Sequence, residues 1–100
     1  MHGAAERGDD PQLLKKHGIP RLADERPDFP FPAVSPQCAE GSSWAPHVST
    51  LRALLNFILE NYRVDCARLF LTGIRMGGNG VWLLATGYPD LFAAAAPVCG

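Results

Sequence analysis

The segment LTGIRMGGNG, residues 71–80, constrains the fold more than any other part of the chain. A short apolar run, residues 68–73, comes before its glycines, and a second apolar stretch, residues 80–90, comes after them. Gly73 and Gly77 bracket Arg75 at a spacing that suits a sharp turn, because glycine leaves room where backbone segments approach closely. We therefore expect a strand, a tight turn and a helix in that order.

A turn of this form has a chemical use, because it holds its central side chain alone above the end of a sheet. The following helix directs its free N–H groups and its positive dipole end at the same point. The N–H of Met76 is placed to stabilise an oxyanion there. The central residue, however, is Arg75, whose guanidinium stays protonated and is a poor nucleophile and base. Three interpretations of Arg75 follow. It is a solvated side chain that replaces, and so disables, a reactive group at the centre of the turn; it is part of an anion site; or it has some other chemistry.

The other elements follow from periodicity and from prolines. Apolar residues at helical spacing from Leu51 to Tyr62 predict an amphipathic helix that starts near Thr50. Residues 11–18 favour a short helix with Pro11 in its first turn and Gly18 as its stop. Four prolines make residues 19–32 mostly irregular, with one turn at residues 22–25. A short buried strand is expected at Ala33 and Val34.

The chain ends in an alanine-rich segment, residues 93–98, that has helical propensity. We expect a strand there, because a new helix just after Pro89 has no room to turn back. The resulting order is strand, helix, strand, helix, strand, which indicates parallel strands joined by right-handed crossovers. The predicted fold is a single α/β domain over residues 1–100, with three layers and a parallel sheet of about three strands flanked by helices.

Composition excludes several classes of protein. The net charge of −1 gives no reason to expect nucleic acid as a partner, and no apolar run is long enough to span a membrane. Residues 1–10 have no apolar signal-peptide region, and three widely spaced cysteines favour a reducing compartment over a disulfide framework. We therefore expect a cytoplasmic protein. The cysteines and three histidines have no metal-ligand spacing, and we expect neither a metal nor a cofactor. GIRMGGNG matches neither a P-loop nor the dinucleotide fingerprint, so a nucleotide site is not expected.

Three segments together resemble the middle of an α/β-hydrolase. They are HGAAERGDDPQLLKKHGIP (2–20), VSPQCAEGSSW (34–44) and RLFLTGIRMGGNGVWLLATGYPDLFAAAAPVCG (68–100). The chain is similar to esterases of the polyhydroxybutyrate depolymerase and feruloyl esterase kind over essentially all its length, with the motifs in the family's order. The resemblance implies that the chain corresponds to a truncated, central part of the family's fold. The family's acidic residue and catalytic histidine would lie beyond Gly100.

The resemblance also implies roles for individual residues. It places Arg75 at the nucleophile position, where the family has serine, and Met76 as one oxyanion N–H. The oxyanion loop corresponds to His2, Gly3, Ala4 and Ala5, and His2 is expected to order this loop. The substrate-binding residues implied are Trp44, Gly77, Gly78 and Asn79, whereas Trp82 is expected in the core.

Two functional hypotheses from different classes follow. The first is an esterase-like protein that lacks the serine mechanism and hydrolyses small esters weakly at most, because Ser42, Ser43 and Ser49 have no elbow around them. The second is a non-catalytic module that binds an anionic ligand or associates with itself. A short parallel sheet with bare edges predicts a homo-oligomer, by edge pairing or by exchange of a strand and helix between copies.

Overall fold

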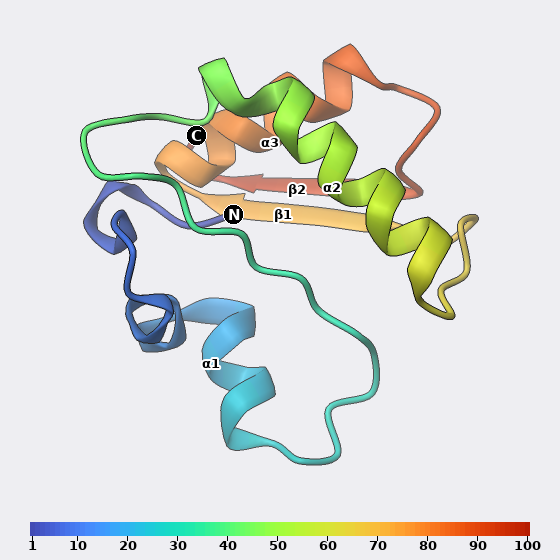
Figure 1. The fold of residues 1–100 in the computed structure, drawn as a ribbon, viewed down its shortest axis with the longest axis horizontal. Helices are drawn as coiled ribbons and strands as arrows, with labels where there is room; N and C mark the ends of the chain where they lie inside the picture. Colours follow the sequence, from blue (N-terminus) through green and yellow to red (C-terminus); the bar gives the residue numbers. More distant parts are fainter.

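The structure is a computed structural model that describes residues 1–100. Its α-helices are α1 (Gly18–Glu25), α2 (Val48–Asn61) and α3 (Met76–Gly87), and its strands are β1 (Phe70–Ile74) and β2 (Ala94–Val98) (Figure 1). Three short 3₁₀ helices complete the fold: η1 (Ala4–Glu6), η2 (Pro11–Lys16) and η3 (Ala45–His47).

The segment β1–α3–β2 forms a crossover unit, as the glycine turn predicts. β1 and β2 are parallel and directly paired, with Phe70 opposite Ala94 and Ile74 opposite Val98. The strand predicted at residues 93–98 is therefore confirmed over the helical alternative. α3 begins at Met76, directly after Arg75, and ends at Gly87 before Pro89. It packs on both strands through buried residues that include Val81 and Leu84.

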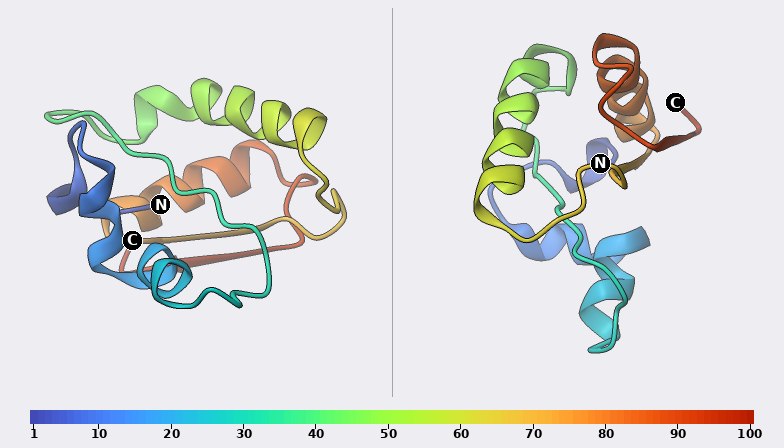
Figure 2. Two further views of the ribbon diagram at one scale, coloured as in Figure 1. Left: turned by 60° about the horizontal axis from the view of Figure 1, so that its bottom comes forward. Right: turned by 90° about the vertical axis from the view of Figure 1, so that its right-hand side faces the viewer.

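The predicted amphipathic helix is α2, which starts at Val48 and ends at Asn61. It lies beside α3 on one side of the strands (Figures 1 and 2). Leu51 of α2, Leu84 of α3, Trp44 and Cys38 form the main buried cluster. This cluster contains no charged side chain, so hydrophobic burial holds the two helices together.

The sheet has two strands rather than about three. Residues 32–39 are irregular, so the strand predicted at Ala33 and Val34 does not form. Pro32 and Pro36 flank that pair, and proline cannot donate to a strand ladder. The outer edge of β1 is instead met by Met1, whose ammonium group donates to Thr72 O at 2.6 Å and whose carbonyl accepts from Ile74 N at 3.1 Å. Burial lowers the pKa of this ammonium group.

The region predicted to be mostly irregular after Gly18 contains α1. Residues 11–16 form the 3₁₀ helix η2, and the side chain of Asp10 caps it by accepting from Gln12 N at 3.0 Å. Gly18 adopts a φ of 63° and begins α1 instead of ending the preceding helix. Pro20 is tolerated because it lies in the first turn, where its missing N–H has no helical partner.

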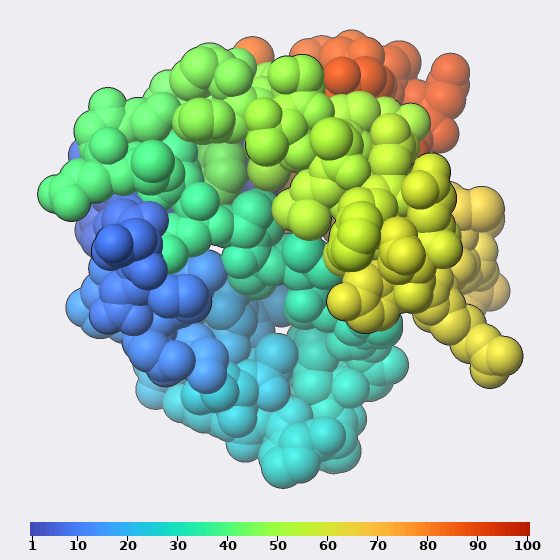
Figure 3. Space-filling view, in the orientation of Figure 1, coloured from blue at the N-terminus to red at the C-terminus, as the bar shows by residue number.

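α1 stands apart from the core. It lies across the strands from α2 and α3 (Figures 1 and 2) and packs mainly with η2. In the space-filling view, the blue and teal residues of this segment form the lower part of the molecule (Figure 3). α1 contains no buried residue.

One face of the sheet is exposed. Side chains alternate between faces along a strand, and Leu71 turns toward the core cluster. The other face carries Phe70, Thr72 and Ile74 of β1 and the opposing Ala94, Ala96 and Val98 of β2, all exposed. We call these six residues the open sheet face. Its largest side chain, Phe70, is 73% exposed.

Candidate functional site

Arg75 sits at the junction of β1 and α3 in a strained backbone conformation. Its φ of 54° and ψ of −114° lie in a region that residues other than glycine rarely occupy, at a typical cost of about 1–3 kcal/mol. Backbone bonds hold it on both sides: Arg75 N donates to Val98 O at 2.7 Å, and Arg75 O accepts from Asn79 N at 3.1 Å. The side chain is exposed and forms no ion pair or hydrogen bond within the chain.

The first turn of α3 adds unpaired donors beside Arg75. The N–H groups of Met76, Gly77 and Gly78 have no helical acceptor, because they belong to the first turn. Gly77 is buried, and a Cβ built on it would overlap the backbone carbonyls of Met1 and His2. Glycine at this position therefore lets the N-terminal segment pass directly over the start of α3.

The predicted oxyanion loop lies next to the elbow. A Cβ built on Gly3 would be 3.7 Å from Arg75 Cβ and 3.6 Å from Ile74 O. The loop then forms the 3₁₀ turn η1. Ala4 and Ala5 are the first two residues of this turn, and their N–H groups have no acceptor. The structure thus brings Gly3, which precedes Ala4, next to Arg75, which precedes Met76.

His2 orders this loop through both ring nitrogens. Its Nε2 accepts from Cys38 N at 2.8 Å, so Nδ1 carries the proton of the neutral ring and donates to Gly3 O at 2.6 Å. The indole Nε1 of Trp44 donates to His2 O at 3.1 Å, and the two rings pack edge to face. Neither nitrogen of His2 is left to accept a proton from a substrate.

The two tryptophans exchange the environments that we expected. Trp44 is only 2% exposed and packs in the core cluster against Gly80 of α3, and its bond to His2 O supports the predicted oxyanion loop. Trp82, expected in the core, is 54% exposed. It follows buried Val81 along α3, and adjacent helix positions face different directions. The remaining predicted binding residue, Asn79, is exposed on the first turn of α3, whereas Gly78 is buried against Val98 and Gly100.

Two polar pairs near the loop were not predicted. Glu6 contacts His17 Nε2 at 3.7 Å, and its side chain, which lies beside Gly3, is 12% exposed. Arg7 does not pair with Glu6 but donates to Ala4 O at 3.0 Å and to Ser42 O at 2.9 Å. The contacts of Glu6 with His17 and of Arg7 with Ser42 join residues distant in sequence, so local sequence patterns do not predict them.

A third pair links Ser42 to His47. The hydroxyl Oγ of Ser42 lies 2.9 Å from His47 Nε2, and both residues are half-buried. Neither residue was assigned a catalytic role from the sequence, because Ser42 is not in an elbow. The five-residue spacing becomes a contact only because η3 turns the chain back after Trp44.

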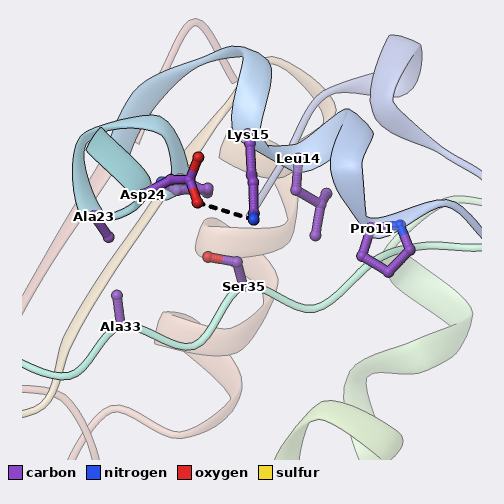
Figure 4. A pocket seen from close by; sticks show the side chains of 8 residues that line it. Pro11, Leu14, Lys15, Ala23, Asp24, Ala33 and Ser35 are labelled. Carbon is purple, nitrogen blue, oxygen red and sulfur yellow. Dashed lines mark ion pairs between the residues drawn. The ribbon is translucent and has the colours of Figure 1, made fainter. Parts of the chain in front are cut away.

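The surface depression between η2, α1 and residues 33–35 lies away from all these groups. Figure 4 shows its lining, in which Lys15 Nζ pairs with Asp24 at 2.9 Å. None of the predicted site residues contributes to it. No group of three or more His, Cys, Asp or Glu side chains is placed to hold a metal ion. None of the helices has the length and apolar character needed to cross a membrane.

Comparison with known proteins gives matches in both sequence and fold. The chain is 31% identical over 51 residues to poly(3-hydroxyalkanoate) depolymerase C of Paucimonas lemoignei, which is 51% of this chain and 12% of that protein. Its fold matches the crystal structure of a thermostable esterase with a TM-score of 0.80 and 29% identity, over 99% of this chain and 31% of the esterase. No family model matches. The chain therefore spans less than a third of each protein it resembles.

Proposed function

We propose that this chain, whose sequence and fold are those of an esterase-like α/β-hydrolase, binds an ester carbonyl or a carboxylate at the elbow and hydrolyses esters weakly at most. The observation that carries the proposal is Arg75: an exposed guanidinium without an acidic partner, held by a strained backbone beside free N–H groups. One relative is by name an esterase and the other a depolymerase of poly(3-hydroxyalkanoate), a polymer joined by ester bonds, which makes an ester or its carboxylate product the natural ligand class.

The chemistry of the site favours an anion or a polarised carbonyl. The N–H groups of Met76 and Ala4 and the positive end of α3 stabilise negative charge on oxygen. The planar guanidinium of Arg75 suits a carboxylate, which it can bind through two parallel hydrogen bonds.

Efficient hydrolysis is not expected at the elbow. Arg75 offers no lone pair for attack, and both nitrogens of His2 are occupied by Cys38 N and Gly3 O. Any turnover at the elbow then depends on water attacking a carbonyl that Arg75 polarises. Because no side chain at the elbow acts as nucleophile or base, the protein contributes only electrostatic stabilisation to the attack by water.

Acetate titration followed by NMR tests binding. We expect the amides of residues 74–79 to shift most, and Arg75→Ala to abolish those shifts. Arg63→Ala is the matched control, because Arg63 is also exposed and has no ion pair. Largest shifts elsewhere, or an unchanged response in Arg75→Ala, would contradict the proposed site.

Turnover of p-nitrophenyl acetate tests the weak activity. We expect a slow rate that falls in Arg75→Ala by the share that the elbow contributes and is unchanged in Arg63→Ala. An equal rate in Arg75→Ala would contradict the proposed activity at the elbow.

A second candidate function is self-association, and the open sheet face favours it. Parallel sheets are normally covered on both faces, yet Phe70, Ile74 and Val98 are exposed here. The face carries no charge, so nothing repels a second copy of the same surface. We expect light scattering coupled to size exclusion to give a multiple of the chain mass, and Phe70→Lys to give the mass of one chain. Phe57→Lys, on α2, is the control; a single-chain mass for the unmodified protein rejects this function.

A further inference from the structure

We propose that Ser42 is a nucleophile activated by His47, forming a second reactive site that is independent of Arg75. The geometry that carries it is the 2.9 Å contact between Ser42 Oγ and His47 Nε2. A serine hydroxyl within hydrogen-bond reach of an imidazole nitrogen is the arrangement that allows general-base activation. The elbow places no such base beside Arg75.

The pair is held in place from both sides. Arg7 donates to Ser42 O at 2.9 Å and so fixes the serine backbone to the oxyanion loop. His47 N donates to Trp44 O at 2.9 Å, which anchors the histidine through the buried indole residue. Ser42 N itself donates to Ala39 O at 3.2 Å. The backbone on either side of the reacting groups is therefore fixed before any substrate arrives.

Stabilisation of negative charge is also available next to Ser42. The N–H of Ser43 has no acceptor within the chain, and it stands in the same relation to Ser42 as the donor that follows a nucleophile in an elbow. The guanidinium of Arg7 has no acidic partner, so its positive charge beside Ser42 is uncompensated. Both residues of the pair are half-buried, which leaves them reachable by a small acyl group.

The reaction is an acyl transfer from a small activated ester. Ser42 Oγ bonds to the carbonyl carbon while His47 Nε2 takes the hydroxyl proton. The bond to the leaving oxygen breaks, and that oxygen receives the proton from His47. Water then attacks the acyl-serine with His47 again taking a proton, which releases the carboxylic acid and restores Ser42.

A fluorophosphonate probe tests this assignment directly, because it traps an activated serine as a stable adduct with loss of fluoride. With the 100-residue protein at neutral pH, we expect one adduct by intact mass, mapped by peptide sequencing to Ser42. Ser42→Ala removes it, and His47→Ala slows its formation by about 10²-fold or more, the usual contribution of a general base. Ser49→Ala, at an exposed serine of α2 outside the pair, leaves the rate unchanged.

Folding is checked in each variant by its circular dichroism melt. Should Ser42→Ala fail to fold, Ser42→Thr, which keeps a hydroxyl group, replaces it, and we expect its labelling to slow at least tenfold because the added methyl group crowds attack. No labelling of the native protein, labelling of another serine, or an equal rate in His47→Ala each overturns the proposal. Since the probe reports on Ser42 and the acetate titration on the amides of residues 74–79, the result is separate from the fate of the elbow site.

Discussion

The crossover unit β1–α3–β2 and the segment that carries η2 and α1 are held by different kinds of contact. The first is tied by strand hydrogen bonds, buried Val81 and Leu84, and a glycine pressed against the backbone of the N-terminal segment. The second has one buried residue, Leu14, and exposed ion pairs. Exposed ion pairs contribute about 0–1 kcal/mol each, so the elbow is built on the stable part and the Lys15–Asp24 depression on the weak one.

The difference also explains why α1 needs its neighbours. A helix of 8 residues is too short to be stable alone in water. Its pairs, Arg21 with Glu25 and Lys15 with Asp24, are both exposed at 2.9 Å. We expect this segment to open locally well before the crossover unit does. Substitutions in the crossover unit should therefore cost more stability than substitutions in α1.

The largest expected effect comes from Gly77→Ala. The added Cβ would overlap the carbonyl groups of Met1 and His2, which cannot move without breaking the edge contact with β1. We expect a loss of about 3 kcal/mol or more in the free energy of unfolding. Gly87→Ala is the control on the same helix, where nothing lies within 4 Å and a gain of about 0.5–1 kcal/mol is expected. Urea denaturation measures the free energy of unfolding of both variants. Equal values for the two variants would contradict the close packing that we assign to Gly77.

A smaller contrast is expected between two leucines. Leu84→Ala leaves a cavity in the core cluster and should cost about 2–4 kcal/mol. Leu22→Ala in α1, where the side chain is 44% exposed, should change stability by about 0.5 kcal/mol or less. Thermal melts measure both, and a large effect of Leu22→Ala would show that α1 contributes to the global core.

Strain at the elbow gives the third contrast. Arg75→Gly removes the side chain and relieves the φ of 54°, whereas Arg75→Ala removes the side chain and keeps the strain. We expect Arg75→Gly to be more stable than Arg75→Ala by about 1 kcal/mol, against the usual order for these residues. Equilibrium unfolding of the pair decides it, and the usual order would mean that the turn relaxes without cost.

The smallest effect concerns the Met1 ammonium group, whose pKa burial lowers below its ordinary value of 8.0. In the interval between the folded and unfolded pKa values, the unfolded chain binds more protons, so stability rises with pH and levels off above about 8. Acetylation of the amino group removes its titration, so the rise of stability with pH that this group causes should be absent from the acetylated chain. Parallel pH titrations of stability for the free and acetylated chains measure the difference.

The sequence predicted the crossover unit well because its signals are local. Gly73 and Gly77 mark the turn, and the spacing of Leu51 and Leu55 marks α2. The class of fold, the resemblance to esterases and the proximity of Gly3 to Arg75 follow from these and from the motif order.

What could not be predicted depends on contacts between distant residues. Glycine at position 18 suits a helix stop as well as a start, so α1 was missed. Pro32 and Pro36 outweighed the apolar pair between them. The burial of Trp44 follows from the absence of a side chain at Gly80, and the Ser42–His47 contact from the turn of η3; neither is visible in a single segment.

The contact between Met1 and Thr72 has a consequence for the order of folding. It spans 71 residues, whereas the bond from Thr72 to Ala96 across the two strands spans 24. Longer loops cost more entropy to close, and contacts distant in sequence slow folding. We expect the two strands and α3 to assemble first and the N-terminal segment to dock onto them afterwards. The elbow then exists before the loop that completes it, and the site is finished in the last step of folding.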